Sequence, residues 1–241
     1  MTATGDGRYV AACWSRAGLA QGVRLSVPGI PGMAVFGVAF GAIAAQKGLT
    51  LFEATLMSAV VFAGASQFVA AEMWTEPMTA AMVVTLGLVT ATVNLRFVLM
   101  SAALQPWLGG LPAWQTYPAL SLMTDPGWLM TTRYRAEGGA DAAVFLGSGC
   151  ALWLVWIAST VPGHLLGTFV TEPKRFGIDL VMPCFFIVML VPLWRGRRKA
   201  IPWLVSGVLA LVAGEFIPGW WFTITGALAG SITAGILDGR A

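Results

Sequence analysis

The sequence predicts an all-α membrane protein with about seven or eight transmembrane helices, some of them discontinuous. Of its 241 residues, 57% are hydrophobic and only 10% are charged, whereas soluble domains have roughly 25% charged residues. The mean hydropathy is +0.77. Uncharged runs include 22 residues between Arg24 and Lys47 and 19 between Glu76 and Arg96. Each run is long enough to cross about 30 Å of hydrocarbon as a helix.

Apolar runs that end at charged residues, glycine or proline predict eight spans. Seven is the alternative, for two reasons. Residues 113–131 need not form a span, and Pro218-Gly219 makes either a turn between two spans or a kink within one. Pro28 and Pro31 in the first span are echoed by two prolines in the sixth, Pro183 and Pro192, which hints at an inverted repeat. The eight spans are residues 27–46, 50–73, 77–103, 113–131, 141–169, 178–194, 200–216 and 217–237.

The chain divides into a cytoplasmic N-terminal segment, residues 1–26, and one transmembrane domain, residues 27–238. The loops are too short for a nucleotide-binding fold, and no P-loop motif occurs. The three cysteines lack metal-site spacing, so we expect no metal and no cofactor. The basic residues are spread among apolar segments and form no surface for nucleic acid. We expect the apolar segments to contact membrane lipid.

The distribution of basic residues predicts the orientation. With eight spans and an internal N-terminus, ten Lys and Arg residues lie on the cytoplasmic side and three on the other. The positive-inside rule therefore favours two cytoplasmic termini. The ten are Arg8, Arg16, Arg24, Arg133, Arg135, Arg195, Arg197, Arg198, Lys199 and Arg240; the three are Lys47, Lys174 and Arg175.

The first span contains GMAVFGVAFGAIA, residues 32–44. Its Gly37 and Gly41 are four residues apart, a spacing that lets two membrane helices approach closely. This motif predicts tight packing rather than chemistry. One helical stripe of the same span holds Gly32, Phe36, Phe40 and Ala44.

Polar groups inside apolar segments mark candidate functional sites, because a charge in hydrocarbon costs about 2.5–3.5 kcal/mol on insertion scales. In GASQF (residues 64–68), Gly64, Ala65 and Ser66 are small enough to let a helix unwind, and Gln67 supplies amide donors and an acceptor. The alternative is small-residue packing with Ser66 bonded back to its own helix.

Asn94 and Arg96 lie in the third span, and Thr124 and Asp125 precede Pro126-Gly127 in the fourth. Arg96 either reaches the interface as an anchor or meets a carboxylate or a substrate. Asp125 is either a turn residue at the surface or an acid at a helix break that pairs with Arg96. His164 is the single histidine and follows Pro162-Gly163, where a proton carrier and a structural hydrogen-bonding group are both plausible.

Four motifs, VFAGASQF, NLRFVLMS, LMTD and GIDLVMPCFFIVMLVPLW, follow in this order over nearly the whole chain. Together they resemble the AzlC-type branched-chain amino acid export permeases. The resemblance implies a permease of the bacterial cytoplasmic (inner) membrane that exports leucine, isoleucine, valine or related hydrophobic amino acids. It also implies a small AzlD-type membrane subunit as partner and makes residues 27–238 the permease domain.

The chain departs from the family pattern at two positions. Phe97 stands where the family commonly has histidine, and Pro126 where it commonly has glutamate. Export against a gradient requires an energy source, for which protons are the expected one. The remaining proton-coupling candidates are Asp125 and His164.

The amino acid would bind where these polar groups meet, with its carboxylate at a half-helix N-terminus or Arg96 and its ammonium at Asp125. Phe62, Phe68 and Phe97 would enclose its side chain. The predicted substrate-binding residues are Gly64, Ala65, Ser66, Gln67, Asn94, Arg96, Thr124 and Asp125.

Two other functions remain as alternatives. Ser66 with His164 has the residue types of an intramembrane serine hydrolase, although Gln67 follows the serine where a glycine is typical. A passive channel or a structural membrane subunit is the other alternative. We expect a transporter without catalytic residues.

Overall fold

The computed structural model describes residues 12–74, 77–169, 196–216 and 221–238, together with positions 184, 187 and 191. The chain divides into two compact units, Met1–Phe185 and Phe186–Ala241. The described residues form helices and loops, without a named β-strand. Most of the expected sixth span, 178–194, lies outside the described residues, and so do Pro183 and Pro192.

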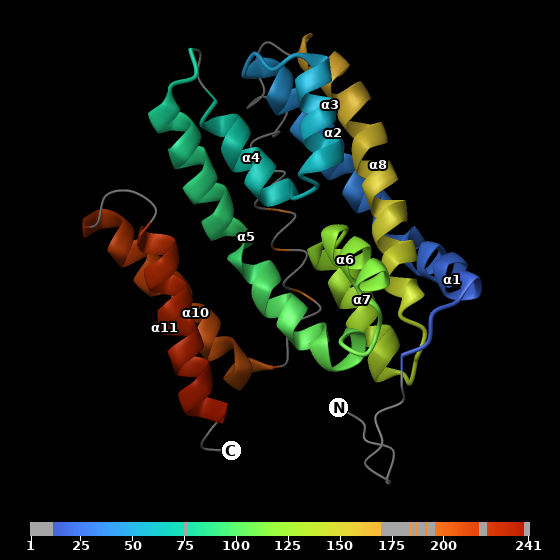
Figure 1. Cartoon of the computed structure of the whole chain (residues 1–241). Helices are drawn as coiled ribbons and strands as arrows, with labels where there is room; N and C mark the ends of the chain where they lie inside the picture. The colour runs from blue at the N-terminus through green and yellow to red at the C-terminus, as the bar shows by residue number, and fades with distance from the viewer. Residues whose placement is uncertain are drawn as a thin grey trace. The chain divides into compact units, whose positions relative to one another are not determined.

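The first unit contains eight named α-helices in its described part (Figure 1). A short 3₁₀ turn, η1 (Val27–Gly29), joins the first two. The helices are α1 (Arg16–Ser26), α2 (Ile30–Gln46), α3 (Leu51–Val60), α4 (Gly64–Glu72), α5 (Ala80–Leu108), α6 (Ala113–Ser121), α7 (Asp125–Ala136) and α8 (Ala143–Gly167).

Three stretches of the described chain are long and apolar enough to cross a membrane: Arg16–Gln46, Ala80–Leu108 and Ala143–Gly167. The first joins α1, η1 and α2, so helix begins well before the expected residue 27. Shorter apolar helices occupy Leu51–Val60, Ala200–Phe216 and Ile224–Leu237. The predicted all-α, multi-pass membrane fold is confirmed.

Helices α2 and α8 pack with their backbones in contact, as the glycine spacing predicted. A Cβ added to Gly41 would lie 2.2 Å from the carbonyl oxygen of Thr160, and one added to Gly163 would lie 2.2 Å from that of Val38. Gly32 differs from the rest of its predicted stripe, because it is exposed and has no atom within 4 Å of an added Cβ. The contact therefore begins about one turn further along α2.

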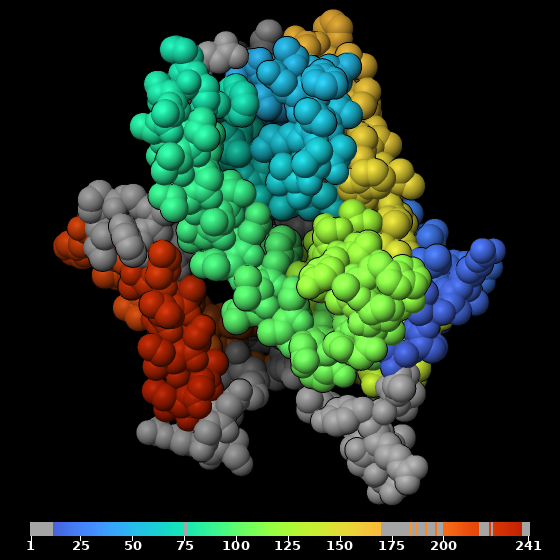
Figure 2. All heavy atoms as spheres, in the orientation of Figure 1, coloured from blue at the N-terminus to red at the C-terminus, as the bar shows by residue number. Residues whose placement is uncertain are grey.

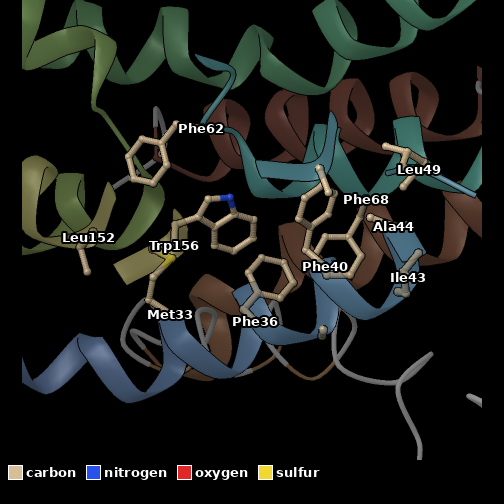
Figure 3. Close-up of a cluster of buried hydrophobic side chains, with 13 residues drawn as sticks. Met33, Phe36, Phe40, Ile43, Ala44, Leu49, Phe62, Phe68, Leu152 and Trp156 are labelled. Atoms are coloured by element: carbon tan, nitrogen blue, oxygen red, sulfur yellow. The ribbon is translucent and has the colours of Figure 1, made fainter. Parts of the chain in front are cut away.

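The main core cluster lies between α2, α4 and α8 (Figure 3). The Phe36 and Phe68 rings stack with centroids 4.7 Å apart, and Phe40 stacks on Trp156 at 5.8 Å. Phe68 was expected to enclose a substrate side chain. Instead it is 2% exposed and packs inside this cluster.

Residues 50–73 do not form the expected single span. Helices α3 and α4 are 10 and 9 residues long, which is about 15 Å each and half a bilayer. Lys47, before α3, pairs with Glu72, at the end of α4, with Nζ and Oε2 2.6 Å apart. Both ends of the segment therefore lie together, and α3–α4 is a helical hairpin with its tip at residues 61–63 (Figure 1).

Residues 113–131 were also expected as a span and form part of a second hairpin, α6–α7. At its tip, residues 122–124, α7 begins beside Arg96 in the middle of α5. At its open end, the Arg135 guanidinium lies over the Trp107 ring in the last turn of α5, 5.6 Å from the ring centroid. The α6–α7 hairpin thus enters from the end of the unit opposite to that used by α3–α4.

The spans and hairpins alternate along the first unit. Residues 16–46 lead to the open end of the α3–α4 hairpin, α5 runs to the other end, and α8 returns. Apolar length alone does not distinguish a crossing helix from a hairpin, which is why the two hairpins were predicted as spans. Two hairpins that enter from opposite ends are the arrangement expected of an inverted repeat.

The second unit contains α10 (Arg197–Phe216) and α11 (Trp221–Asp238) in its described part. They pack antiparallel: a Cβ on Gly226 would meet Ala210, and one on Gly230 would meet Ser206. The last two predicted spans therefore correspond to two helices, α10 and α11, rather than to one kinked helix; Pro218-Gly219 lies outside the described residues.

Candidate functional site

A cavity of about 260 Å³ lies where the tips of the two hairpins meet α5. Its size is close to the lower end of the roughly 300–1,000 Å³ typical of ligand pockets, so a small molecule fits it. Figure 2 shows a hollow on this face, between the ends of α3 and α6 beside α5. The wall consists of Val61, Phe62 and Ala63 from the first tip, Asn94, Phe97, Val98 and Ser101 from α5, and Leu120, Ser121 and Met123 from the second hairpin.

The first tip is an interrupted backbone that its own hairpin holds in place. Phe62 has φ +42°, a left-handed conformation unusual for a bulky residue. The Ala63 N–H donates to Oε1 of Gln67 at 3.1 Å, and the Ser66 hydroxyl donates to the Ala63 carbonyl at 2.9 Å. The break precedes GASQF, whereas the sequence predicted unwinding within it; GASQF forms the first turn of α4.

Gln67 is fully buried behind the tip and does not line the cavity. Its Nε2 donates to the Ser58 hydroxyl at 3.4 Å, and Ser58 is hydrogen-bonded to Thr160 of α8 at 2.9 Å. One end of the Gln67 amide therefore bonds the interrupted backbone at Ala63, and the other end connects it through Ser58 to α8. In the conformation observed the amide is bonded within the protein at both ends, and the substrate-binding role of Gln67 stays a prediction.

We expect Gln67→Ala to lower the stability of the folded protein by about 1–3 kcal/mol, because the buried Ala63 N–H loses its acceptor. Transport per folded molecule should stay near wild type. Thermal unfolding in detergent and transport normalised to folded protein measure the two effects. Gln105→Ala, at an exposed position of α5, is the matched control. Normal stability combined with lost specific transport would instead mean that the amide meets the substrate.

Asn94 is joined to the first hairpin and also lines the cavity. Its Nδ2 donates to the Ser66 hydroxyl at 3.2 Å. Its Oδ1 is buried and has no hydrogen-bond partner among the residues that the structure describes. Asn94 thus brings a buried acceptor without a described donor to the edge of the cavity.

Arg96 and Asp125 form a bidentate ion pair between α5 and the start of α7. Nε donates to Oδ1 and a terminal guanidinium nitrogen donates to Oδ2, both at 3.0 Å. The pair agrees with the contact expected from the sequence, and its side chains are 30% and 25% exposed. Asp125 is also the first residue of α7, where the helix dipole favours a negative charge.

Two further contacts define the second tip. The Thr124 hydroxyl caps α7 by accepting from the Gly127 N–H at 3.2 Å. The Trp128 indole N–H donates to the Met100 carbonyl at 3.1 Å and ties α7 to α5. The interruption precedes Asp125, and Pro126 continues the helix because proline is tolerated in a first turn, where its missing N–H costs no bond.

His164 lies away from both tips. Its Nε2 is 2.7 Å from the carbonyl oxygen of Leu49, at the open end of the α3–α4 hairpin. Because a carbonyl only accepts, Nε2 carries the proton, and Nδ1 has no partner within the described ranges. The Ser66 hydroxyl contacts Ala63 and Asn94, so the structure does not bring Ser66 and His164 together as a hydrolytic pair.

The sequence analysis singled out Phe62, Asn94 and Phe97 but missed most of the cavity wall. Val61, Ala63 and Met123 directly precede the two predicted break motifs, and that position is the signal that could have identified them. Val98, Ser101 and Leu120 follow only from the way α5 and α6 pack, which no local motif indicates.

An all-α, multi-pass bundle with interrupted helices that meet at a cavity defines a membrane transport protein. The chain belongs to the AzlC family: the family model described as "AzlC protein" matches residues 28–170, which include both hairpins and the cavity.

Two relatives cover most of the chain. It is 24% identical over 208 residues to the "Branched-chain amino acid transport protein AzlC" of Bacillus subtilis (strain 168), which covers 85% of this chain and 79% of that protein. It is also 24% identical over 204 residues to an "Uncharacterized membrane protein" of Archaeoglobus fulgidus, which covers 83% and 84%. No solved structure matches the chain.

Proposed function

We propose that this protein is a permease that exports branched-chain or related hydrophobic amino acids across the cytoplasmic membrane. The observation that carries the proposal is the cavity between the two hairpin tips. Its wall joins a small set of polar groups to large apolar side chains, the composition typical of small-molecule sites. The name of the Bacillus subtilis relative supports branched-chain amino acids as the substrate class.

The substrate side chain lies against Phe62, Phe97 and Met123 of the cavity wall. Its carboxylate binds at the first turn of α4, a helix that starts beside the cavity and has no side-chain cap. The unbonded amides and the dipole of such a turn favour an anion. Arg96 and Asp125 neutralise each other in this structure, so neither one holds an end of the substrate in the conformation observed.

The same proposal makes export proton-coupled. Protonation of Asp125 removes the charge that holds Arg96 and so weakens the link between α5 and α7, which connects proton binding to movement at the second tip. His164, with its open Nδ1 at the other hairpin, is the second candidate. A small AzlD-type membrane subunit completes the transporter, a proposal that rests on the family resemblance.

The N-terminus lies in the cytoplasm of a bacterial cell. Replacing two spans by hairpins moves two loops, residues 73–79 and 109–112, to the opposite side. Neither loop contains Lys or Arg, so the ten-to-three charge count that supports this orientation is unchanged.

Everted membrane vesicles test the function directly. With the AzlD-type subunit co-expressed, acidification of the vesicle interior is expected to drive accumulation of labelled leucine above its external concentration, and an uncoupler is expected to abolish that accumulation. A passive channel would only equilibrate leucine, with or without the gradient. A structural subunit would leave uptake at the level of vesicles that lack the protein.

A further inference from the structure

We propose that Asn94 recognises the protonated amino group of the substrate and so restricts the site to amino acids, as opposed to carboxylic acids of the same shape. The inference rests on the proposed function and assigns one residue of that site a specific role. Asn94 is the single asparagine of the chain and one of the ten described residues that line the cavity.

The hydrogen bonds around Asn94 fix which end of its amide is free. The Ser66 hydroxyl has one hydrogen, which it donates to the Ala63 carbonyl at 2.9 Å. Ser66 must therefore accept in its contact with Asn94, so the NH₂ end of Asn94 faces Ser66 at 3.2 Å. The other end, Oδ1, is the buried atom without a partner among the described residues.

A buried acceptor without a donor is destabilising, so its presence at a cavity wall indicates a ligand that brings a donor. An ammonium group offers three N–H donors and no acceptor. The alternative acceptor for an ammonium, Asp125, has both carboxylate oxygens bonded to Arg96. Oδ1 of Asn94 is therefore a buried acceptor beside the cavity whose missing donor an amino group can supply.

The position of Asn94 beside the first hairpin matches the layout of an amino acid. Ser66, to which its amide is bonded, lies in the first turn of α4, where the proposed function binds the carboxylate. The two charged ends of an amino acid are one carbon apart, so neighbouring donor and acceptor groups suit both at once. Gln67, the residue after Ser66, carries the same amide group as Asn94, but the two ends of its amide are bonded to Ala63 and Ser58.

The test compares leucine with 4-methylpentanoate, which has the same side chain and carboxylate but no amino group. Binding of each to the purified protein, with the small subunit co-expressed, is measured by calorimetry or by competition with labelled leucine. We expect Asn94→Ala to weaken leucine binding about ten- to a hundredfold, the value of one hydrogen bond to a charged group, and to leave 4-methylpentanoate binding unchanged. Asn94→Asp, which keeps an oxygen acceptor, should retain the preference for leucine.

Ser121→Ala is the matched control, because Ser121 lines the same cavity but its hydroxyl is bonded to the Pro118 carbonyl. It should leave the ratio of the two affinities as in wild type. An Asn94→Ala variant that weakens both ligands equally, or neither, would overturn the role of Asn94 while leaving the permease function intact. Failure of the wild-type protein to bind any branched-chain amino acid would instead remove the proposed function, and the role of Asn94 with it.

Discussion

Arg96→Ala is expected to abolish transport and to lower the amount of folded protein. The change leaves the Asp125 carboxylate without the two hydrogen bonds that now neutralise it. Breaking a buried ion pair costs about 3–5 kcal/mol. The two side chains are 30% and 25% exposed, so we expect a loss near the lower end of that range. Thermal unfolding and transport per folded molecule give the two readouts.

Combining Arg96→Ala with Asp125→Asn should recover folding but not transport, because the uncompensated charge is gone but both members of the coupling pair have been removed. The pair Arg133–Glu137 supplies a control, since its side chains are 81% and 65% exposed. Arg133→Ala should change stability by less than about 0.5 kcal/mol. Normal transport by both single variants at the Arg96–Asp125 pair would show that it has no part in the mechanism.

Gly41→Leu is expected to prevent assembly of the first unit. Even a single added carbon at this position would lie 2.2 Å from the Thr160 carbonyl oxygen and 2.6 Å from the His164 nitrogen. Both are backbone atoms of α8, so no side chain can rotate away and the two helices must separate. Overpacking costs about 1–3 kcal/mol where the surroundings can adapt, and we expect more here. Membrane abundance and the elution profile in detergent measure the loss.

Gly32→Leu is the matched control on the same helix, because an added Cβ there meets no atom within 4 Å. It should leave abundance and elution as in wild type. Equal damage from both substitutions would mean that a leucine is harmful anywhere in this helix, and the close approach of α2 and α8 would not be the reason.

Much of the fold could be predicted from the sequence, because it depends on local properties. Uncharged apolar length identified the helices, and Gly37 with Gly41 identified the packing face of α2. The hairpin at 50–73 could not be predicted. Its 24 mostly apolar residues are long enough to cross a bilayer. The return of the chain is recorded only in tertiary contacts, the Lys47–Glu72 ion pair at the open end and the hydrogen bond from Ser58 to α8.

Several residues of the candidate site could be predicted from the sequence, but the role of each one could not. A charge at membrane depth was sufficient to single out Arg96 and Asp125, because each requires a partner. Gln67 and Asn94 carry the same amide group, and no local pattern indicates which of the two is fully bonded. That difference depends on Ser58, on the N–H of Ala63 freed by the break, and on Thr160, a hundred residues further along the chain.

The dependence of the first tip on α8 has a consequence for the order in which the chain is made. Ser58 meets Thr160, 102 residues later, and the Ala59 carbonyl accepts from the Trp153 indole, 94 residues later. During synthesis the α3–α4 hairpin therefore emerges before the helix that completes its hydrogen bonds. Polar backbone is not stable in contact with lipid, so the hairpin reaches its final place in the membrane only after α8 has been translated.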